Sequence, residues 1–279
     1  MSMKNTTVII IAASSDIGAY LAEHYLQRGA RVYGTYRSLT SEVSRLQAAG
    51  VVFFPLDIGS IDSVCGFSTA LKSAGVRWDV VVSAPGVLSP IGPFFELDFD
   101  EWERSVMTNS LSQLRVLHAI YPLRVDHHVA KVIFFAGGGT NSAFDNYSAY
   151  CIGKLSLIKM TELLDSECPD LQVSIIGTGW VNTKIHQQTL AAGVAAGVNL
   201  EKTRDFIESN QHHGASLEAV AECLDWCLNA PRAAVGGRNF SMVHDAWRDP
   251  EFTAKLELET GTYKLRRQSR HFPTDKVIS

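Results

Sequence analysis

Residues 8–30 read VIIIAASSDIGAYLAEHYLQRGA and join a β-branched run, a turn of small residues and an amphipathic stretch. The run predicts a buried strand, and the amphipathic stretch predicts a helix with Gly18 in its first turn. In such a strand–turn–helix unit the free N–H groups of the first helical turn can bind a pyrophosphate. The stretch therefore predicts the first unit of a nucleotide-binding α/β fold.

The same alternation continues along the chain. Further β-branched or aromatic runs begin at residues 31, 51, 79, 131 and 172, and helix-like sequence follows each, after a loop in the last case. This rhythm predicts a parallel sheet covered by helices on both faces. With a helix from 216 and a seventh strand at 238–243, we expect an α/β fold: a single doubly wound Rossmann-type domain with a mainly parallel seven-stranded sheet.

Two segments depart from this rhythm. Residues 177–215 are long for a connection and rich in Ala, Gly, Gln and His, so we expect a mobile substrate lid with short helices of its own. Residues 246–279 form a C-terminal tail whose basic end we interpret as solvated or as a subunit contact. The main domain is then expected to span residues 1–245.

Composition and charge limit the classes of binding partner that we expect. The 279 residues are 46% hydrophobic and carry a net charge of −4, which suits one large globular domain. Because no dense basic run precedes the last twenty residues, we expect a small-molecule partner and no nucleic acid. The first residues hold too few apolar side chains for a signal peptide or a membrane span. Five cysteines without a CxxC pair favour a cytoplasmic location.

We predict no metal site. Cys223 and Cys227 lie one helical turn apart and could form half a site, but two buried core cysteines are favoured. The pairs His127–His128 and His212–His213 lie in polar connections, and no carboxylate follows them at ligand spacing. Adjacent residues are expected to point in different directions, so we interpret both pairs as solvated loop residues.

Tyr150 and Lys154 indicate the chemistry. On a helix over 147–165, their spacing of four residues places both side chains on one face. A nearby ammonium, together with an oxidised nicotinamide ring, would lower the pKa of the phenol. Tyr150 could then donate a proton to a carbonyl oxygen, or accept one from an alcohol.

At these positions the chain resembles the short-chain dehydrogenase/reductase family over residues 6–245. Where that family has TGxxxGxG, Ile11, Ala12, Asp16 and Gly18 stand at the conserved positions, and Ser83-Ala84-Pro85-Gly86 stands at its NNAG. YCIGK at 150–154 matches its YxxxK, and GTGWVNT at 177–183 is similar to its PGxVxT. By resemblance, Lys154 also binds the nicotinamide ribose, and Asn109, on a long helix over 101–121, holds a water that links Lys154 to solvent.

The resemblance implies a dinucleotide cofactor along the carboxyl ends of the strands. Asp57 and Ile58 would border the adenine, and Val181 and Thr183 would meet the carboxamide. The residues expected to contact the cofactor are Ala12, Ser14, Ser15, Ile17, Gly18, Arg37, Asp57, Ile58, Ser83, Gly86, Lys154, Gly179, Val181 and Thr183.

Two residues, Arg37 and Asp16, affect which cofactor is expected and how it would bind. Arg37 stands where an acid would select NAD(H), so we predict NADP(H) in preference, unless Arg37 is an ordinary surface arginine. Asp16 would repel the diphosphate unless it turns away; alternatively Asp16 or Ser15 caps the helix.

One catalytic group is absent from the pattern. The family's serine lies thirteen residues before the tyrosine, and that position here is Gly137. Thr140 or Ser142, carried by a flexible glycine loop, could replace its hydrogen bond; equally, no side chain replaces it, and these hydroxyls and Ser148 only cap the helix.

Two functions remain open. The first is an NADPH-dependent carbonyl reductase, or the reverse alcohol dehydrogenase, that uses Tyr150 and Lys154. The second is a catalytically silent dinucleotide-binding protein that serves as a sensor or an assembly subunit. By resemblance a homodimer or homotetramer is expected through helices 101–121 and 147–165. Trp180 and Trp247 are either ligand-stacking or core residues.

Overall fold

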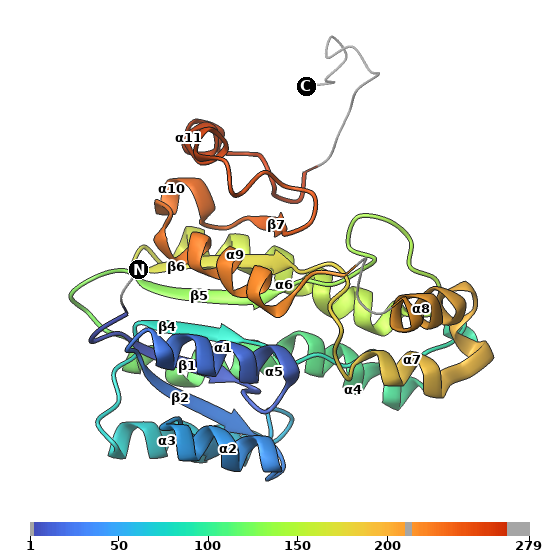
Figure 1. Ribbon diagram of the computed structural model, residues 1–279, viewed down its shortest axis with the longest axis horizontal. Helices are drawn as coiled ribbons and strands as arrows, with labels where there is room; N and C mark the ends of the chain where they lie inside the picture. The colour runs from blue at the N-terminus through green and yellow to red at the C-terminus, as the bar shows by residue number, and fades with distance from the viewer. Residues whose placement is uncertain (1–2, 210–213, 267–279) are drawn as a thin grey trace, which may run out of the picture.

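A computed structural model describes residues 3–209 and 214–266 of the chain. Its sheet has seven strands, all parallel, in the order β3-β2-β1-β4-β5-β6-β7 (Figure 1). The doubly wound parallel sheet is therefore confirmed. The pair His212–His213 and the basic end of the tail from 267 lie outside the described residues. The strands are β1 (Thr7–Ile11), β2 (Arg31–Tyr36), β3 (Val52–Pro55), β4 (Val80–Ser83), β5 (Ala130–Phe135), β6 (Leu171–Gly177) and β7 (Asn239–Ser241).

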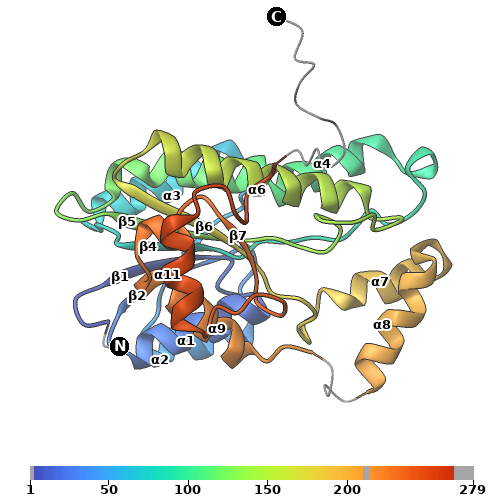
Figure 2. The same cartoon turned by 90° about the horizontal axis from the view of Figure 1, so that it is seen from above.

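The central strands are buried on both faces, which explains their unbroken apolar sequence. In β1, Val8 and Ile10 pack into one core cluster, and Ile9 and Ile11 pack into another on the opposite face. Figure 2 shows the two helical layers on either side of the sheet. One layer holds α1 (Asp16–Gln27), α2 (Ser41–Ala49) and α9 (Leu217–Asn229); the other holds α3 (Ile61–Ser73), α4 (Phe99–Asn109), α5 (Leu111–Ile120) and α6 (Ser148–Glu167).

The expected long helix over 101–121 is wrong, because it is interrupted at Ser110. That residue has φ −141° and ψ −87°, outside the helical region, and its hydroxyl donates to the carbonyl of Val106 at 2.6 Å. A side chain that bonds the backbone in this way competes with the helical pattern. The interruption leaves Asn109 as the last residue of α4, facing the connection that follows β4.

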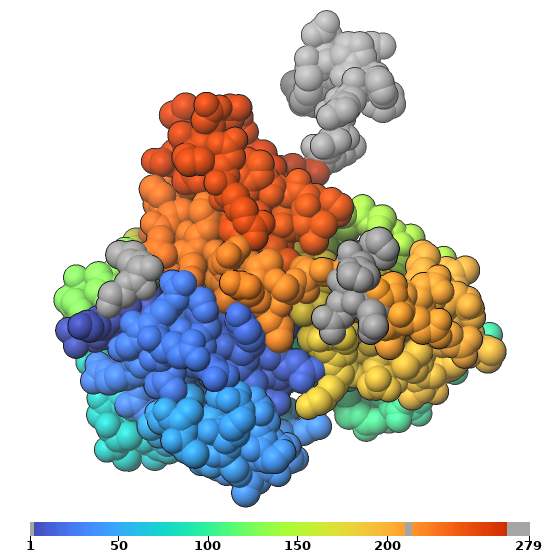
Figure 3. Space-filling view, viewed as in Figure 1, coloured from blue at the N-terminus to red at the C-terminus, as the bar shows by residue number. Residues whose placement is uncertain are grey.

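The segment that follows β6, the lid, has short helices of its own, as expected. It contains α7 (His186–Ala192), the 3-10 turn η3 (Gly193–Ala196) and α8 (Val198–Glu208), which lie beyond the carboxyl ends of the strands (Figures 1 and 2). In Figure 3 these yellow and gold residues form a lobe beside the main body. Ala196 and Leu200 of the lid pack with Tyr147 and Tyr150 in a small third cluster, so the lid lies directly on the helix that carries Tyr150.

The C-terminal segment does not separate from the domain at residue 246. Trp247 and Leu256 are buried in the same core cluster as β1, and α11 (Pro250–Leu258) packs on α10 (Arg232–Val235). Buried Arg238 donates to the backbone carbonyls of Leu256, Glu259 and Thr262, which fastens the segment to the start of β7. Residues 246–266 thus complete the domain.

The short turns η1 (Phe94–Glu96) and η2 (Tyr121–Leu123) complete the elements. Within residues 3–209 and 214–266, no helix combines the length and the apolar character needed to cross a membrane.

Candidate functional site

A cavity of about 1220 Å³ lies beyond the carboxyl ends of β4, β5, β6 and β7, under the lid. This is where ligands bind in doubly wound sheets. The predicted site residues that line it are Ile17, Gly86, Thr140, Ser142, Tyr150, Lys154, Gly179, Val181 and Thr183. The predicted residues outside its lining are Ala12, Ser14, Ser15, Gly18, Arg37, Asp57, Ile58, Ser83 and Asn109.

The turn after β1 opens helix α1 toward this end of the sheet. Ser15 caps the helix, and its hydroxyl accepts from the backbone N–H of Gly18 at 3.2 Å. A Cβ on Gly18 would lie 2.3 Å from the carbonyl oxygen of Ala12, so only glycine fits there. Ala12 itself has φ +60°, a left-handed conformation that favours glycine. The turn therefore keeps its shape although only one of its glycines remains.

Asp16 turns toward the lid. Its carboxylate accepts from the backbone N–H of Lys184 at 2.6 Å and lies 3.4 Å from the Lys184 ammonium. Ser15, and not Asp16, provides the helix cap, which decides between the two alternatives for the cap. Asp16 thus links the first turn of α1 to the segment between β6 and α7.

Arg37, Asp57 and Ile58 follow the ends of β2 and β3. Arg37 is exposed; the Asp57 carboxylate accepts from the N–H of Gly59 at 2.9 Å, and Ile58 packs against the core. Thr35, which the sequence did not single out, is buried in β2, and its hydroxyl accepts from the N–H of Ala12 at 2.9 Å. Thr35 thereby fixes the left-handed turn from the neighbouring strand.

The connection after β4 is held by two buried amides. Ser83 donates to Gln113 at 2.8 Å, and the Gln113 amide donates to the carbonyl of Pro85 at 3.2 Å. Asn109 accepts from the N–H of Val87 at 3.1 Å and donates to its carbonyl at 2.8 Å. Through these hydrogen bonds, the side chains of Ser83 and Asn109 bond other groups of the protein. The bonds also hold the Pro-Gly turn beside the cavity.

Tyr150 and Lys154 lie together on the buried face of α6. The Lys154 ammonium is 5.9 Å from the centre of the Tyr150 ring. It donates to the carbonyls of Phe135 at 2.9 Å and Pro85 at 3.3 Å, which join it to the ends of β5 and β4. A Cβ on Gly86 would come within 3.9 Å of that ammonium and 4.0 Å of the Asn109 side-chain oxygen, so the two side chains flank the same glycine.

The pKa of Tyr150 differs from the expected direction. Burial raises the pKa of Tyr150, with a smaller contribution from Cys151, whereas the sequence predicted a lowered value. Burial also lowers the pKa of Lys154 to about 8. Both groups are enclosed, and burial disfavours the charged form of each.

The loop after β5 is packed tightly against α6. A Cβ on Gly137 would lie 2.0 Å from the Tyr150 hydroxyl oxygen, and one on Gly139 would lie 2.4 Å from the Cys151 sulfur. Gly139 also has φ +78°. The glycines therefore give the helix close access to the loop, and the expectation of a loop left free to move by its glycines does not fit this packing.

Of the three hydroxyls near Gly137, two reach the cavity. Thr140 and Ser142 line it, and the Thr140 hydroxyl donates to the carbonyl of Gly137 at 3.2 Å. Ser148 instead accepts from the indole N–H of Trp102 at 2.9 Å. None of the three caps α6 with its side chain.

The lid contributes residues that the sequence did not single out. The Gln188 side-chain oxygen accepts from the N–H groups of Leu88 and Ser89, and Tyr147 bonds Thr189 at 2.9 Å. Trp180 lines the cavity and stacks on His186 with 5.2 Å between ring centres, whereas Trp247 is a core residue. Pairing between segments about 100 residues apart leaves no local signal in sequence.

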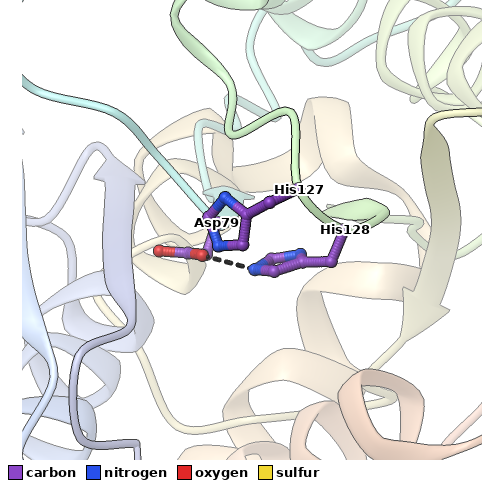
Figure 4. A group of neighbouring side chains, drawn as sticks. All are labelled: Asp79, His127 and His128. Atoms are coloured by element: carbon purple, nitrogen blue, oxygen red, sulfur yellow. Dashed lines mark hydrogen bonds and ion pairs between the residues drawn. The ribbon is translucent and has the colours of Figure 1, made fainter.

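His127 and His128 are exposed loop residues, as predicted, but the expectations that no carboxylate lies near them and that the two side chains point in different directions are wrong. The His128 ring lies 2.8 Å from the carboxylate of Asp79, and the two imidazoles are in contact with ring centres 4.5 Å apart (Figure 4). Asp79 is distant in sequence, and the parallel sheet brings it beside the histidines.

The cavity and its edges fit a dinucleotide. The first turn of α1 and the left-handed Ala12 form a small-residue turn at one side, and the buried Lys154 ammonium is available at the other. Ile17, Gly179, Val181 and Thr183 line the space between the first strand unit and the lid.

Comparison with known proteins agrees with this geometry. The family of short chain dehydrogenases matches residues 6–193. An uncharacterized oxidoreductase of Schizosaccharomyces pombe is 30% identical over 179 residues, which are 63% of this chain and 71% of the relative. An NADPH-dependent pterin aldehyde reductase of Arabidopsis thaliana is 24% identical over 185 residues, 64% of this chain and 76% of the relative. The crystal structure of a short-chain dehydrogenase/reductase from Saccharomyces cerevisiae superposes with a TM-score of 0.75 at 21% identity, covering 89% of this chain and 98% of that one.

Proposed function

The chain belongs to the short-chain dehydrogenase family, and from that premise we propose that it reduces a ketone with NADPH, or oxidises the corresponding alcohol. The observation that carries the proposal is the buried pair on α6. Tyr150 lines the cavity, and the Lys154 ammonium beside it is anchored to the ends of two strands.

Tyr150 acts as the general acid in the reduction. When bound, a reduced nicotinamide would supply the hydride for the carbonyl carbon. The Tyr150 phenol donates its proton to the carbonyl oxygen, which yields the alcohol. Because burial raises its pKa, the phenol holds its proton at neutral pH until an acceptor oxygen arrives. Lys154, with its pKa of about 8, is mostly protonated there and stabilises the phenolate that remains.

Thr140 or Ser142 is the proposed partner of the substrate oxygen in place of a hydroxyl at position 137. Both line the same cavity as Tyr150. Among oxyanion donors in other enzymes, one hydrogen bond contributes about 2.7–4 kcal/mol to the transition state. Thr140→Val and Ser142→Ala, measured separately, identify the donor by the larger loss of turnover.

The proposed reaction is tested with pure protein, NADPH and a panel of ketones. Loss of NADPH absorbance with wild type, reduced by about 10²- to 10⁴-fold in Tyr150→Phe, supports the proposal. Tyr147→Phe is the matched control, because Tyr147 is another buried tyrosine of the cavity whose hydroxyl bonds Thr189. Turnover that Tyr150→Phe does not lower would contradict it.

A silent dinucleotide-binding protein is the second candidate, and Gly137 is the observation that favours it. If NADPH binds, as followed by the fluorescence of its nicotinamide, while no ketone or alcohol is turned over, the sensor or assembly function replaces the enzymatic one.

The preference for NADPH is proposed from Arg37. It is exposed after β2, where its guanidinium can pair with a 2′-phosphate. The similarity to an NADPH-dependent relative supports this choice. Arg37→Ala is expected to raise the KM for NADPH about ten- to a hundredfold without changing that for NADH. Arg31→Ala, at the exposed opposite end of the same strand, should leave both constants unchanged.

We also propose a cytoplasmic homodimer or homotetramer formed through α4, α5 and α6. Exposed apolar side chains on two of these helices, Leu111 and Ile152, support this surface, and the five free cysteines suit a reducing compartment. Light scattering should give a dimer or tetramer, and Ile152→Glu should lower the mass.

A further inference from the structure

Asp79, His127 and His128 converge at the end of the sheet opposite the cavity (Figure 4). Asp79 directly precedes β4, and the histidines lie in the connection between η2 and β5. One ligand atom from each of the three residues lies within 4.8 Å of the others. We propose that these residues bind a divalent transition-metal ion, with Zn²⁺ as the best match.

The carboxylate is held in place by the sheet. Asp79 is 8% exposed, and its Oδ2 accepts from the backbone N–H of Thr7 in β1 at 2.7 Å. Its Oδ1 faces His128. Ligating carboxylates in metal sites are commonly oriented by such a second hydrogen bond. Asp79 therefore offers one oriented oxygen on a rigid part of the fold.

His128 lies between two groups that only accept hydrogen bonds. Its Nε2 is 2.8 Å from Asp79 Oδ1, and its Nδ1 is 3.2 Å from the carbonyl oxygen of Val129. A neutral imidazole carries one N–H, so it can satisfy only one of these acceptors. Two arrangements fit these contacts: Nε2–H donates directly to Asp79, or Nδ1–H donates to Val129 and Nε2 shares a metal ion with Asp79. Nδ1–H donation to a backbone carbonyl, with Nε2 left as ligand, is the usual arrangement of metal-binding histidines.

His127 supplies the third ligand and separates the two possibilities. Its side chain is 70% exposed, and its ring packs edge-on against that of His128. A proton shared by His128 and Asp79 makes no use of His127, whereas a metal ion does. Two imidazoles and one carboxylate leave a fourth position for water, a set that Zn²⁺ accepts and that Mg²⁺ or Ca²⁺, which prefer oxygen ligands, do not.

A metal ion here would fasten the connection before β5 to the start of β4. Through Thr7 the link extends to β1, so three strands would be tied at one end. Since the site is at the opposite end of the sheet from Tyr150, metal binding is expected to raise the melting temperature and to leave turnover unchanged.

The test uses the full chain without an affinity tag, freed of metal by a chelator and titrated with Zn²⁺ in a calorimeter. Wild type should bind one equivalent at this site. His127→Ala and His128→Ala should each weaken that binding at least about tenfold. His118→Ala, an exposed histidine outside the cluster, is the matched control and should bind as wild type does. Zn²⁺ should raise the melting temperature of wild type and of His118→Ala, and not that of His127→Ala.

Two results would overturn the proposal. Equal Zn²⁺ affinity in wild type and His127→Ala would leave only a proton between His128 and Asp79. A wild type that binds no Zn²⁺ would exclude the site. Because His127 is exposed and holds no buried contact in the core, its variant is expected to fold, which circular dichroism verifies.

Discussion

The turn after β1 and the loop after β5 border the same end of the sheet and use glycine in opposite ways. In the first, Ala12 occupies a left-handed conformation where glycine is ordinarily favoured. In the second, Gly137 occupies a position where a Cβ would be 2.0 Å from the Tyr150 hydroxyl. The turn after β1 has alanine where glycine is ordinarily favoured, and the loop after β5 has glycine where no side chain fits.

Backbone strain and steric exclusion have unequal consequences at these two positions. A left-handed alanine costs about 1–2 kcal/mol, and the Thr35 hydroxyl holds it in place by accepting from its N–H. A Cβ at Gly137 must displace Tyr150 itself, because the overlap is with the ring and hydroxyl of a buried side chain. The first change alters stability, and the second alters the position of Tyr150, the proposed general acid.

Substitution of Gly137 is expected to have the strongest effect on activity. Gly137→Ala should lower turnover about 10²- to 10⁴-fold, because the added methyl moves Tyr150, the proposed general acid, out of place. Steady-state NADPH oxidation measures the loss. Gly138→Ala is the control, since the nearest atoms to a Cβ there are 3.8 Å away on Phe144. Full turnover in Gly137→Ala, or a gain in Gly137→Ser, would show that Tyr150 does not react from this position.

The second prediction concerns the desolvation of the Lys154 ammonium in the folded chain. Lys154 has a pKa of about 8 in the folded chain against its ordinary 10.5, so below pH 8 the folded state buries a cation at a cost. Between pH 8 and 10.5 the folded chain has lost this proton while the unfolded chain keeps it, so stability rises with pH. The unfolding free energy of Lys154→Met lacks this dependence on pH. Relative to that variant, wild type should therefore gain about 3 kcal/mol of unfolding free energy from pH 7 to 10.5.

Urea unfolding of both proteins at several pH values measures that change. Lys159→Met, an exposed lysine on the same helix, provides the baseline. A difference between wild type and Lys154→Met that stays constant with pH would mean that Lys154 is solvated in the folded state.

The third prediction concerns the strained turn. Ala12→Gly should stabilise the fold by about 0.5–1 kcal/mol, because glycine adopts φ +60° without the Cβ clash. Ala13→Gly next to it should destabilise, since Ala13 is buried and has no left-handed backbone. Thermal unfolding distinguishes the two variants, and an equal loss in both would contradict the strain at Ala12.

The smallest expected effect is at Asp16. Asp16→Asn removes a negative charge from the end of α1 that is proposed to bind the cofactor and keeps an oxygen for the N–H of Lys184. NADPH should bind about two- to fivefold more tightly, and the gain should diminish in salt because the group is partly exposed. Asp62→Asn, in the first turn of α3, should have no effect on fluorescence titrations with NADPH.

The sequence predicted the sheet, its helical layers and the pair on α6, because each depends on local period. The unbroken apolar run of β1 and the four-residue spacing of Tyr150 and Lys154 can be recognised within a single segment. It predicted the single helix over 101–121 and the separate tail wrongly. Hydrogen bonds of Ser110 and Arg238 decide those features, and the bonds of Arg238 reach across the fold.

What the sequence alone determined is the class of fold, the family resemblance and the residues available for chemistry. The tertiary structure decided how those residues act: Asp16 turns to Lys184, Tyr150 is enclosed with a raised pKa, and Asp79 meets His128. The physical reason is that period and capping are properties of neighbouring residues. Desolvation, steric exclusion and charge pairing depend instead on which distant segments the sheet brings together.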